Sequence, residues 1–288
     1  EVNTFASDVT VSVDPADFLI RIDGGTPVSG GQTTVTGDGD HTAEALTPDG
    51  STVVDSVDFT IDTTAPTITI DTPALPPAGR PLPMYPQSDG NSALLPGPRS
   101  SFSCGDSGAN GSGIVSCLDQ DGNPTDTPLD VSTLGIHTFT VFARDAAGHI
   151  TTLSREYEVV KFTGFFAPID NPPTTNQARA GQIVAVKWRL QRLVNGELVP
   201  LADPTSFVSI TATQTTGGTC AGQADPVETT SGSSGLQYLG DGNWQFNWAT
   251  LRSYRNGCFV MKLNLWDAHF NGTTPTGHPA AFANFQFR

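Results

Sequence analysis

The sequence predicts an all-β protein of three β-sandwich domains in line. The first observation is a repeated unit: residues 135–143 alternate as in a half-buried strand, and a turn follows at residues 145–148. Residues 39–46 carry the same pattern earlier in the chain, and residues 240–248 form a looser copy. The second observation is composition, because 30 glycines and 22 prolines favour turns over helices. The third is that no segment sustains the period of an amphipathic helix.

We expect the domains at residues 1–63, 64–160 and 161–288, which are ordinary sizes for β domains. In the first, Val9, Val11 and Val13 share one face of a predicted strand. Pro66 marks the first junction, because proline interrupts the hydrogen bonds between strands. The third domain begins after Lys161, where aromatic residues become dense.

A strong strand is predicted in the third domain. Val184, Val186, Trp188 and Leu190 share one face, and Lys187 lies on the other. Intramolecular isopeptide bonds form where a lysine meets a carboxylate in an apolar core. The opposite face therefore predicts an ordinary side chain for Lys187.

The chain is acidic, with a net charge of −15. Such a surface repels phosphate backbones and anionic lipids, so we expect no nucleic acid partner. No apolar run approaches the roughly 18 residues that cross a bilayer, so we expect no membrane insertion. The acidity has two interpretations: solubility, and attraction for calcium or cationic surfaces.

Four cysteines can pair in three ways. Cys104 and Cys117 flank a loop rich in glycine and serine, and Cys220 and Cys258 both lie in the third domain. We expect pairing within each domain, which places the protein in an oxidising, extracytoplasmic compartment. The chain begins at Glu1 without a signal peptide, so we expect a mature or truncated product.

Residues 71–100 hold eight prolines. This stretch is too long for an ordinary β connection, and we expect an extended surface loop inserted in the second domain. The alternative is a polyproline ligand for an aromatic groove.

Two families are suggested by motifs. The stretch Ile61-Asp62-Thr63-Thr64-Ala65-Pro66 resembles the linker that joins bacterial immunoglobulin-like repeats, and the segments around Cys104, Cys117 and His137 resemble the disulfide-containing members. The third domain is similar to the PxKF domain found at the C-termini of bacterial secreted proteins. Its matching stretches are Phe165-Phe166-Ala167-Pro168-Ile169-Asp170-Asn171-Pro172-Pro173, Ala180-Gly181, Ser234-Gly235-Leu236-Gln237-Tyr238 and the phenylalanine-rich end.

The resemblance implies tandem immunoglobulin-like β-sandwiches on an extracellular bacterial protein or at the bacterial cell surface. The motif that names the PxKF domain is altered here, with Ala185 in place of proline and Trp188 in place of phenylalanine. No catalytic residues of these families can be carried over, so the resemblance implies no enzyme activity.

The stretch Gly105-Asp106-Ser107-Gly108 is similar to the nucleophile motif of chymotrypsin-like proteases. That chemistry needs a histidine base and a buried orienting carboxylate. The only upstream histidine is His41, in another domain, and Ala109 replaces the expected second glycine. We therefore interpret the stretch as a disulfide loop. His41 and His137 occupy equivalent positions of the repeat, which favours a packing or turn role over a metal site.

Two calcium hypotheses concern aspartates. Asp119 and Asp121 have the spacing of the first two ligands of a calcium-binding loop, but the remaining ligands are missing from the sequence that follows. A hairpin tip is therefore the simpler interpretation. Asp58, Asp62 and Asp71 lie near the first junction and are the candidates for calcium between domains. Otherwise we expect no cofactor.

Trp244, Phe246 and Trp248 share one face of a strand. Exposed, they would form a stacking platform for sugar rings; buried, they would be sandwich core, which we favour.

The leading functional hypothesis is a non-catalytic stalk, adhesin or surface-assembly unit, whose partners are other surface proteins, glycans or copies of itself. The alternatives are an accessory region of a secreted hydrolase, binding carbohydrate or cell wall, and a subunit of a self-assembling filament.

Overall fold

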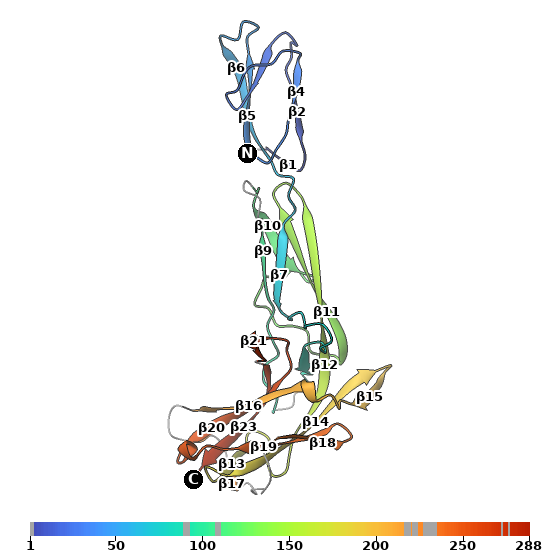
Figure 1. The fold of residues 1–288 in the computed structure, drawn as a ribbon, viewed down its shortest axis with the longest axis vertical. Helices are drawn as coiled ribbons and strands as arrows, with labels where there is room; N and C mark the ends of the chain where they lie inside the picture. The colour runs from blue at the N-terminus through green and yellow to red at the C-terminus, as the bar shows by residue number, and fades with distance from the viewer. Residues whose placement is uncertain are drawn as a thin grey trace. The chain divides into compact units, whose positions relative to one another are not determined.

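The computed structural model describes residues 3–88, 93–106, 111–215, 220, 224–226, 235–271, 273–275 and 277–288 (Figure 1). The predicted all-β fold is confirmed, and the helices among these residues are two single 3-10 turns, η1 (Pro204–Ser206) and η2 (Arg252–Tyr254). None of the described helices is long and apolar enough to span a membrane.

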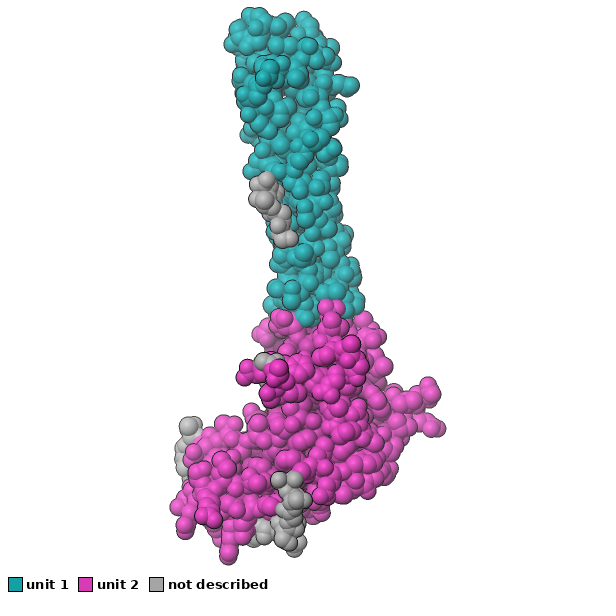
Figure 2. Space-filling model, in the orientation of Figure 1, with its two compact units in different colours: residues 1–70, 102–125, 140–154 teal, residues 71–101, 126–139, 155–288 magenta. Residues whose placement is uncertain are grey.

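The chain divides into two compact units, coloured separately in Figure 2. Unit 1 holds residues 1–70, 102–125 and 140–154, and unit 2 holds residues 71–101, 126–139 and 155–288. These units divide the chain differently from the three segments expected from the sequence. The domain boundaries near residues 63 and 160 therefore stay a prediction.

The described strands of unit 1 are β1 (Asn3–Phe5), β2 (Val9–Ser12), β3 (Leu19–Ile22), β4 (Gln32–Val35), β5 (Gly39–Leu46), β6 (Val53–Ile61) and β10 (Ile114–Asp119). Four strands, β7 (Thr67–Thr72), β9 (Ser101–Gly105), β11 (Gly135–Asp145) and β12 (Ile150–Phe166), have residues in both units. The first 61 residues form one sheet in the order β1-β6-β5-β3 and a second of β2 and β4. One buried cluster of this region consists of Val35, Ala43, Phe59 and Ile61, and Ile20 and Leu46 are buried as well.

The described strands that lie wholly in unit 2 are β8 (Met84–Pro86), β13 (Thr175–Ala178), β14 (Ile183–Val194), β15 (Glu197–Pro200), β16 (Phe207–Gln214), β17 (Ala224–Pro226), β18 (Leu236–Gly240), β19 (Asn243–Ala249), β20 (Cys258–Leu265), β21 (Phe270–Asn271), β22 (Thr274–Pro275) and β23 (His278–Phe287). One layer contains β12-β14-β19-β18, and the other is β16-β20-β23-β13-β17. Trp188 of β14 is fully buried between them, so the predicted core face is confirmed.

The proline-rich stretch differs from the expected surface loop. Met84 and Tyr85 are fully buried, and β8 pairs with β12 in parallel register. The indole of Trp266 donates a hydrogen bond of 2.9 Å to the carbonyl of Pro81. The expectation was wrong for Met84 and Tyr85, because prolines leave an extended chain that can still pair along one edge. Leu75 in the same stretch is 65% exposed, so that part lies at the surface as expected.

Candidate functional site

Both disulfides form as predicted. Cys104 of β9 pairs with Cys117 of β10, with a Cα–Cα distance of 5.9 Å. Cys220 pairs with Cys258 of β20, with a Cα–Cα distance of 5.3 Å. No cysteine is left free, so the chain offers no thiolate for catalysis or for a metal.

The two repeat histidines share a structural role. The Nε2 atom of His41 bonds the carbonyl of Gly37 at 3.0 Å, and the Nε2 atom of His137 bonds the carbonyl of Thr133 at 2.8 Å. Each histidine thus closes the turn that precedes its own strand. The hydrogen bond that His41 donates to the carboxylate of Asp23 raises the pKa of the imidazole above its ordinary value. Turn closure is the role expected from the repeat.

The carboxylates of Asp119 and Asp121 accept hydrogen bonds within their own hairpin tip. The Oδ1 atom of Asp119 accepts the backbone N–H groups of Asp121 and Asn123 at 2.9 and 2.8 Å. The carboxylate of Asp121 accepts the amide of Gln120 at 3.2 Å. Among the described residues, neither aspartate belongs to a group of three close metal-ligating side chains. The hairpin tip accounts for both residues.

The aromatic triplet of β19 is not a sugar-binding platform. Trp244 is 2% exposed, and its indole N–H donates to the carbonyl of Leu201 at 2.9 Å. Trp248 is 6% exposed and packs edge-on against Phe285. Phe246 packs on Phe207, with ring centroids 5.1 Å apart. Trp244 and Trp248 are buried, as the core interpretation predicts, whereas Phe246 is half-buried.

The protease-like stretch is described only in part. Ser107 and Gly108 lie outside the described residues. Asp106 is described, and its Oδ2 atom accepts the backbone N–H of Gly113 at 2.7 Å.

The described residues contain one group of three metal-ligating side chains, and it lies in unit 1. Ligand atoms of Asp62, Asp145 and His149 all lie within 4.8 Å of one another. Asp62 follows β6, and Asp145 ends β11. Asp62 is fully buried and Asp145 is 1% exposed. Of the junction aspartates expected from the sequence, Asp62 joins this group, while Asp58 and Asp71 do not.

Protein donors already satisfy both carboxylates. The Oδ2 atom of Asp62 accepts the backbone N–H and the hydroxyl of Ser112 at 2.8 and 2.6 Å, and its Oδ1 atom accepts the N–H of Thr64 at 3.0 Å. The Oδ1 atom of Asp145 accepts the N–H groups of Gly148 and His149, and its Oδ2 atom lies 2.9 Å from Nδ1 of His149. The group therefore stands as a hydrogen-bonded network without an added ion.

The same donors set the charge state of Asp62. Burial alone would raise the pKa of this carboxyl, but the two hydrogen bonds from Ser112, the amide of Thr64 and the charge of His149 together lower it below its ordinary value. Asp62 is thus held as a carboxylate inside the protein. A buried carboxylate with several donors fixes the position of every segment that supplies one.

The network connects the linker to the segments on both sides of it. On one side, Asp38 accepts the N–H and the hydroxyl of Thr63 at 2.9 and 2.8 Å, and the N–H of Asp62 donates to the carbonyl of Phe5. On the other side, the hydroxyl of Thr151 donates to the carbonyl of Pro66. Residues 62–66 are therefore hydrogen-bonded at both ends.

The network is not arranged for nucleophilic catalysis. The hydroxyl of Ser112 donates to Asp62 and accepts the N–H of Ala147 at 3.1 Å. Among the described residues, no hydrogen bond joins Ser112 to His149. A serine nucleophile needs a histidine base at hydrogen-bonding distance, and here the histidine is paired with Asp145.

Asp145 and His149 are not among the site residues that the sequence predicts as partners of Asp62. The segment at residues 145–148 was interpreted only as a turn. The local signal was a buried strand that ends in aspartate and is followed four residues later by histidine. That pattern does not indicate Asp62 as the partner, because the two aspartates are more than 80 residues apart in the chain.

No protein family matches the chain, and no curated protein sequence is similar to it. Solved structures that align with this chain include three N-terminal domains of the highly immunogenic outer capsid protein (Hoc) of bacteriophage RB49, at 11% identity and a TM-score of 0.34, covering 100% of this chain and 95% of that one. Titin domains I67–I69 align at 12% identity and a TM-score of 0.28, covering 99% and 93%. A tandem repeat from the extending region of a large adhesion protein aligns at 17% identity and a TM-score of 0.22, covering 98% and 70%. No argument about function follows from likeness at this level.

Proposed function

We propose that this chain is a non-catalytic structural or adhesive segment of an extracellular protein, in which stiffly joined β-sandwiches hold a binding partner away from a surface. The extracellular setting is supported by two disulfides, which persist in oxidising compartments. A bacterial origin is part of the proposal and rests on the linker-like stretch of residues 61–66.

The observation that carries the proposal is the hydrogen-bonded linker. A tether for free domain motion needs a solvated, unconstrained linker. Here the carboxylate of Asp62 is fully buried and binds Ser112, while Asp38 binds Thr63. A joint built in this way resists bending, and this is the property that a spacer needs.

The chemistry of the described residues agrees with a non-catalytic role. Both cysteine pairs are oxidised. The carboxylates and the histidine of the Asp62 network form hydrogen bonds with one another and with nearby backbone amides. A hydrolase would need a nucleophile with a base and an orienting group in the same site.

Small-angle X-ray scattering tests the stiff joint. We expect the scattering of the wild-type chain to fit a single conformation. Asp62→Asn replaces one acceptor oxygen by an NH₂ group, so we expect its scattering to require an ensemble with a broader distribution of distances. Asp8→Asn makes the same change at an exposed position and serves as the control. A wild-type chain that already scatters as a flexible ensemble would contradict the proposed function.

A further inference from the structure

Strand β6 has an open edge over most of its length. On one side it pairs with β5 from Val53 to Ile61. On the other side β1 covers only Phe59, Thr60 and Ile61, in parallel register. Among the described strands, none pairs with that side of residues 53–58. An uncovered edge of this kind is a template for an added strand.

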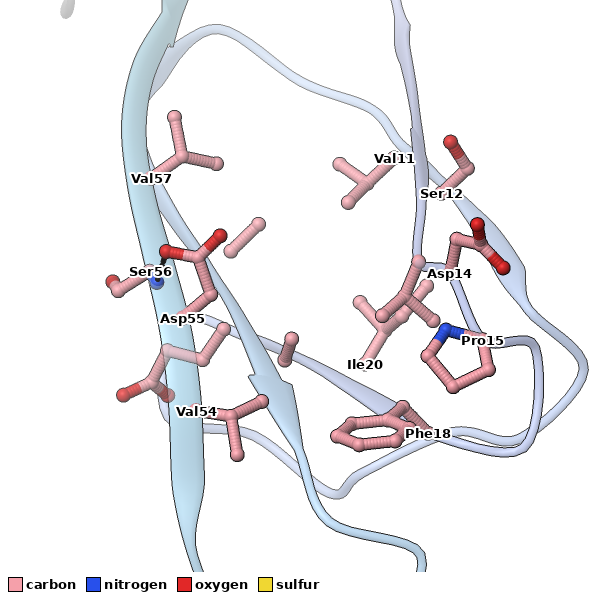
Figure 3. A pocket seen from close by; sticks show the side chains of 14 residues that line it. Val11, Ser12, Asp14, Pro15, Phe18, Ile20, Val54, Asp55, Ser56 and Val57 are labelled. Carbon is pink, nitrogen blue, oxygen red and sulfur yellow. Dashed lines mark hydrogen bonds between the residues drawn. The ribbon is translucent and has the colours of Figure 1, made fainter.

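A groove with both apolar and polar walls lies beside this edge. It has a volume of about 250 Å³ and is lined from β2 by Val11, from the following turn by Phe18, and from β6 by Val54 and Val57. Figure 3 shows Val54 and Val57 projecting from β6 across the opening. Each of these two valines is 50% exposed. Apolar surface is thus left in contact with water beside the open edge, although the core cluster of this region is small.

The carboxylate of Asp55 caps a backbone amide on the open edge of β6. Its Oδ1 atom accepts the backbone N–H of Ser56 at 2.8 Å, as the dashed line in Figure 3 shows. A charged side chain at an edge is a common protection against uncontrolled pairing. A partner that carries a cation beside its strand would bind the carboxylate of Asp55 and release this amide for pairing.

The charge around the groove is strongly one-sided. Residues 1–63 contain twelve Asp and Glu side chains and one arginine, which gives −11 of the net −15 of the chain. Asp14, Glu44 and Asp55 line the groove, and no lysine or arginine does. Arg21 neutralises Glu44 through an ion pair of 2.6 Å, which leaves Asp14 and Asp55. Such a surface attracts a basic segment and repels the same region of a second copy.

We propose that the edge of β6 and its groove bind an extended segment of a partner protein in which apolar and basic residues alternate. The segment adds a strand that continues the row begun by β1. Its apolar side chains fill the groove beside Val54 and Val57, and its cations pair with Asp55 and Asp14. The inference rests on the proposed adhesive function and specifies its partner.

A synthetic peptide of alternating lysine and valine is the probe, titrated into the full chain by calorimetry and by amide NMR. The matched peptide of alternating glutamate and valine is its control. We expect the basic peptide to bind more weakly as salt rises, with amide shifts concentrated at residues 53–58 and on the groove lining. We expect no binding of the acidic peptide. Shifts spread over other surfaces would overturn the proposal.

The variant Val54→Asp with Val57→Asp separates groove binding from general charge attraction. It adds negative charge while removing the apolar wall, so a merely electrostatic peptide would bind it more tightly. We expect affinity to fall roughly tenfold or more. Unchanged or tighter binding would overturn the proposal. Should this variant not fold, Asp14→Asn with Asp55→Asn gives the second test: weaker binding with a smaller salt dependence supports the proposal, and unchanged binding contradicts it.

Sedimentation of the peptide-free chain tests the competing occupant. Self-association that disappears in the Val54→Asp, Val57→Asp variant would assign the groove to a second copy and overturn the proposal. A monomer at all concentrations supports it. The proposed function fails on the scattering of the peptide-free chain, whereas this inference fails on peptide binding, so the two failures are distinguishable.

Discussion

Trp188 is fully buried, and its indole N–H has no hydrogen-bond acceptor among the described residues. The ring packs against Phe207, with centroids 5.4 Å apart. The residue therefore contributes a large apolar surface and also carries an unpaired donor, whose burial costs about 1–3 kcal/mol.

We predict that Trp188→Ala lowers the free energy of unfolding by about 3–5 kcal/mol, because the sandwich cannot collapse onto so large a cavity. Trp188→Phe should cost much less, since the smaller ring also removes the unpaired donor. Urea denaturation of both variants measures the two costs. A harmless alanine variant would show that the core face of β14 is wrongly assigned.

Asp62 gives a prediction about pH. Its pKa is lowered in the folded chain, so the network stabilises folding above the unfolded value of about 3.9 and loses this contribution as pH falls through the folded pKa. We expect Asp62→Asn to melt at a lower temperature than the wild type at neutral pH. The difference should shrink as pH falls through the acid range. Thermal unfolding at several pH values checks this, and a difference independent of pH would contradict it.

The disulfide between β9 and β10 is the clearest stabilising connection between two strands of unit 1. It closes a segment with a sequence separation of 13 residues. In the chain-entropy account, a loop of this size stabilises folding by about 3 kcal/mol. Replacing Cys104 and Cys117 together by serine should lower the free energy of unfolding by that amount in a denaturant titration. A paired replacement of Cys220 and Cys258 is the comparison: its longer loop should cost about 4 kcal/mol, and the reverse order of costs would refute the loop-length argument.

Local pattern was enough to predict the strands and their faces. The alternation in β14 placed Val184, Val186 and Trp188 in the core because a strand repeats every two residues. The same rule predicted Trp244 and Trp248 as core. The hairpin tip at Asp119 followed from turn chemistry within five residues.

Contacts between segments that are distant in the chain could not be predicted from the sequence. The burial of Met84 and Tyr85 depends on β12, which lies about 70 residues further along the chain. The network of Asp62 likewise depends on Ser112 and Asp145, and the open edge of β6 depends on where β1 ends. Each of these is decided by tertiary packing, which overrides local preference.

Charge and core are unevenly distributed over the whole molecule. Residues 1–63 carry −11, which leaves −4 for the remaining residues of the chain. Six hydrophobic residues are buried among the described residues of that region, Ile20, Val35, Ala43, Leu46, Phe59 and Ile61, whereas the described cluster of unit 2 has 23 buried members. The N-terminal region therefore combines the smaller hydrophobic stabilisation with the stronger repulsion among its own charges.

We predict that this imbalance appears as a salt-dependent, low-temperature step in calorimetric unfolding. At about 10 mM salt the screening length is roughly 30 Å, so the carboxylates of the N-terminal region repel one another across its full width; at about 150 mM it falls to roughly 8 Å. The first step should therefore move to higher temperature with sodium chloride, while the later step moves less. Calcium chloride at matched ionic strength is the control, because screening alone predicts a shift similar to that with sodium, whereas a specific calcium site would add a larger one. A single step that does not respond to salt would show that repulsion does not limit the stability of this region.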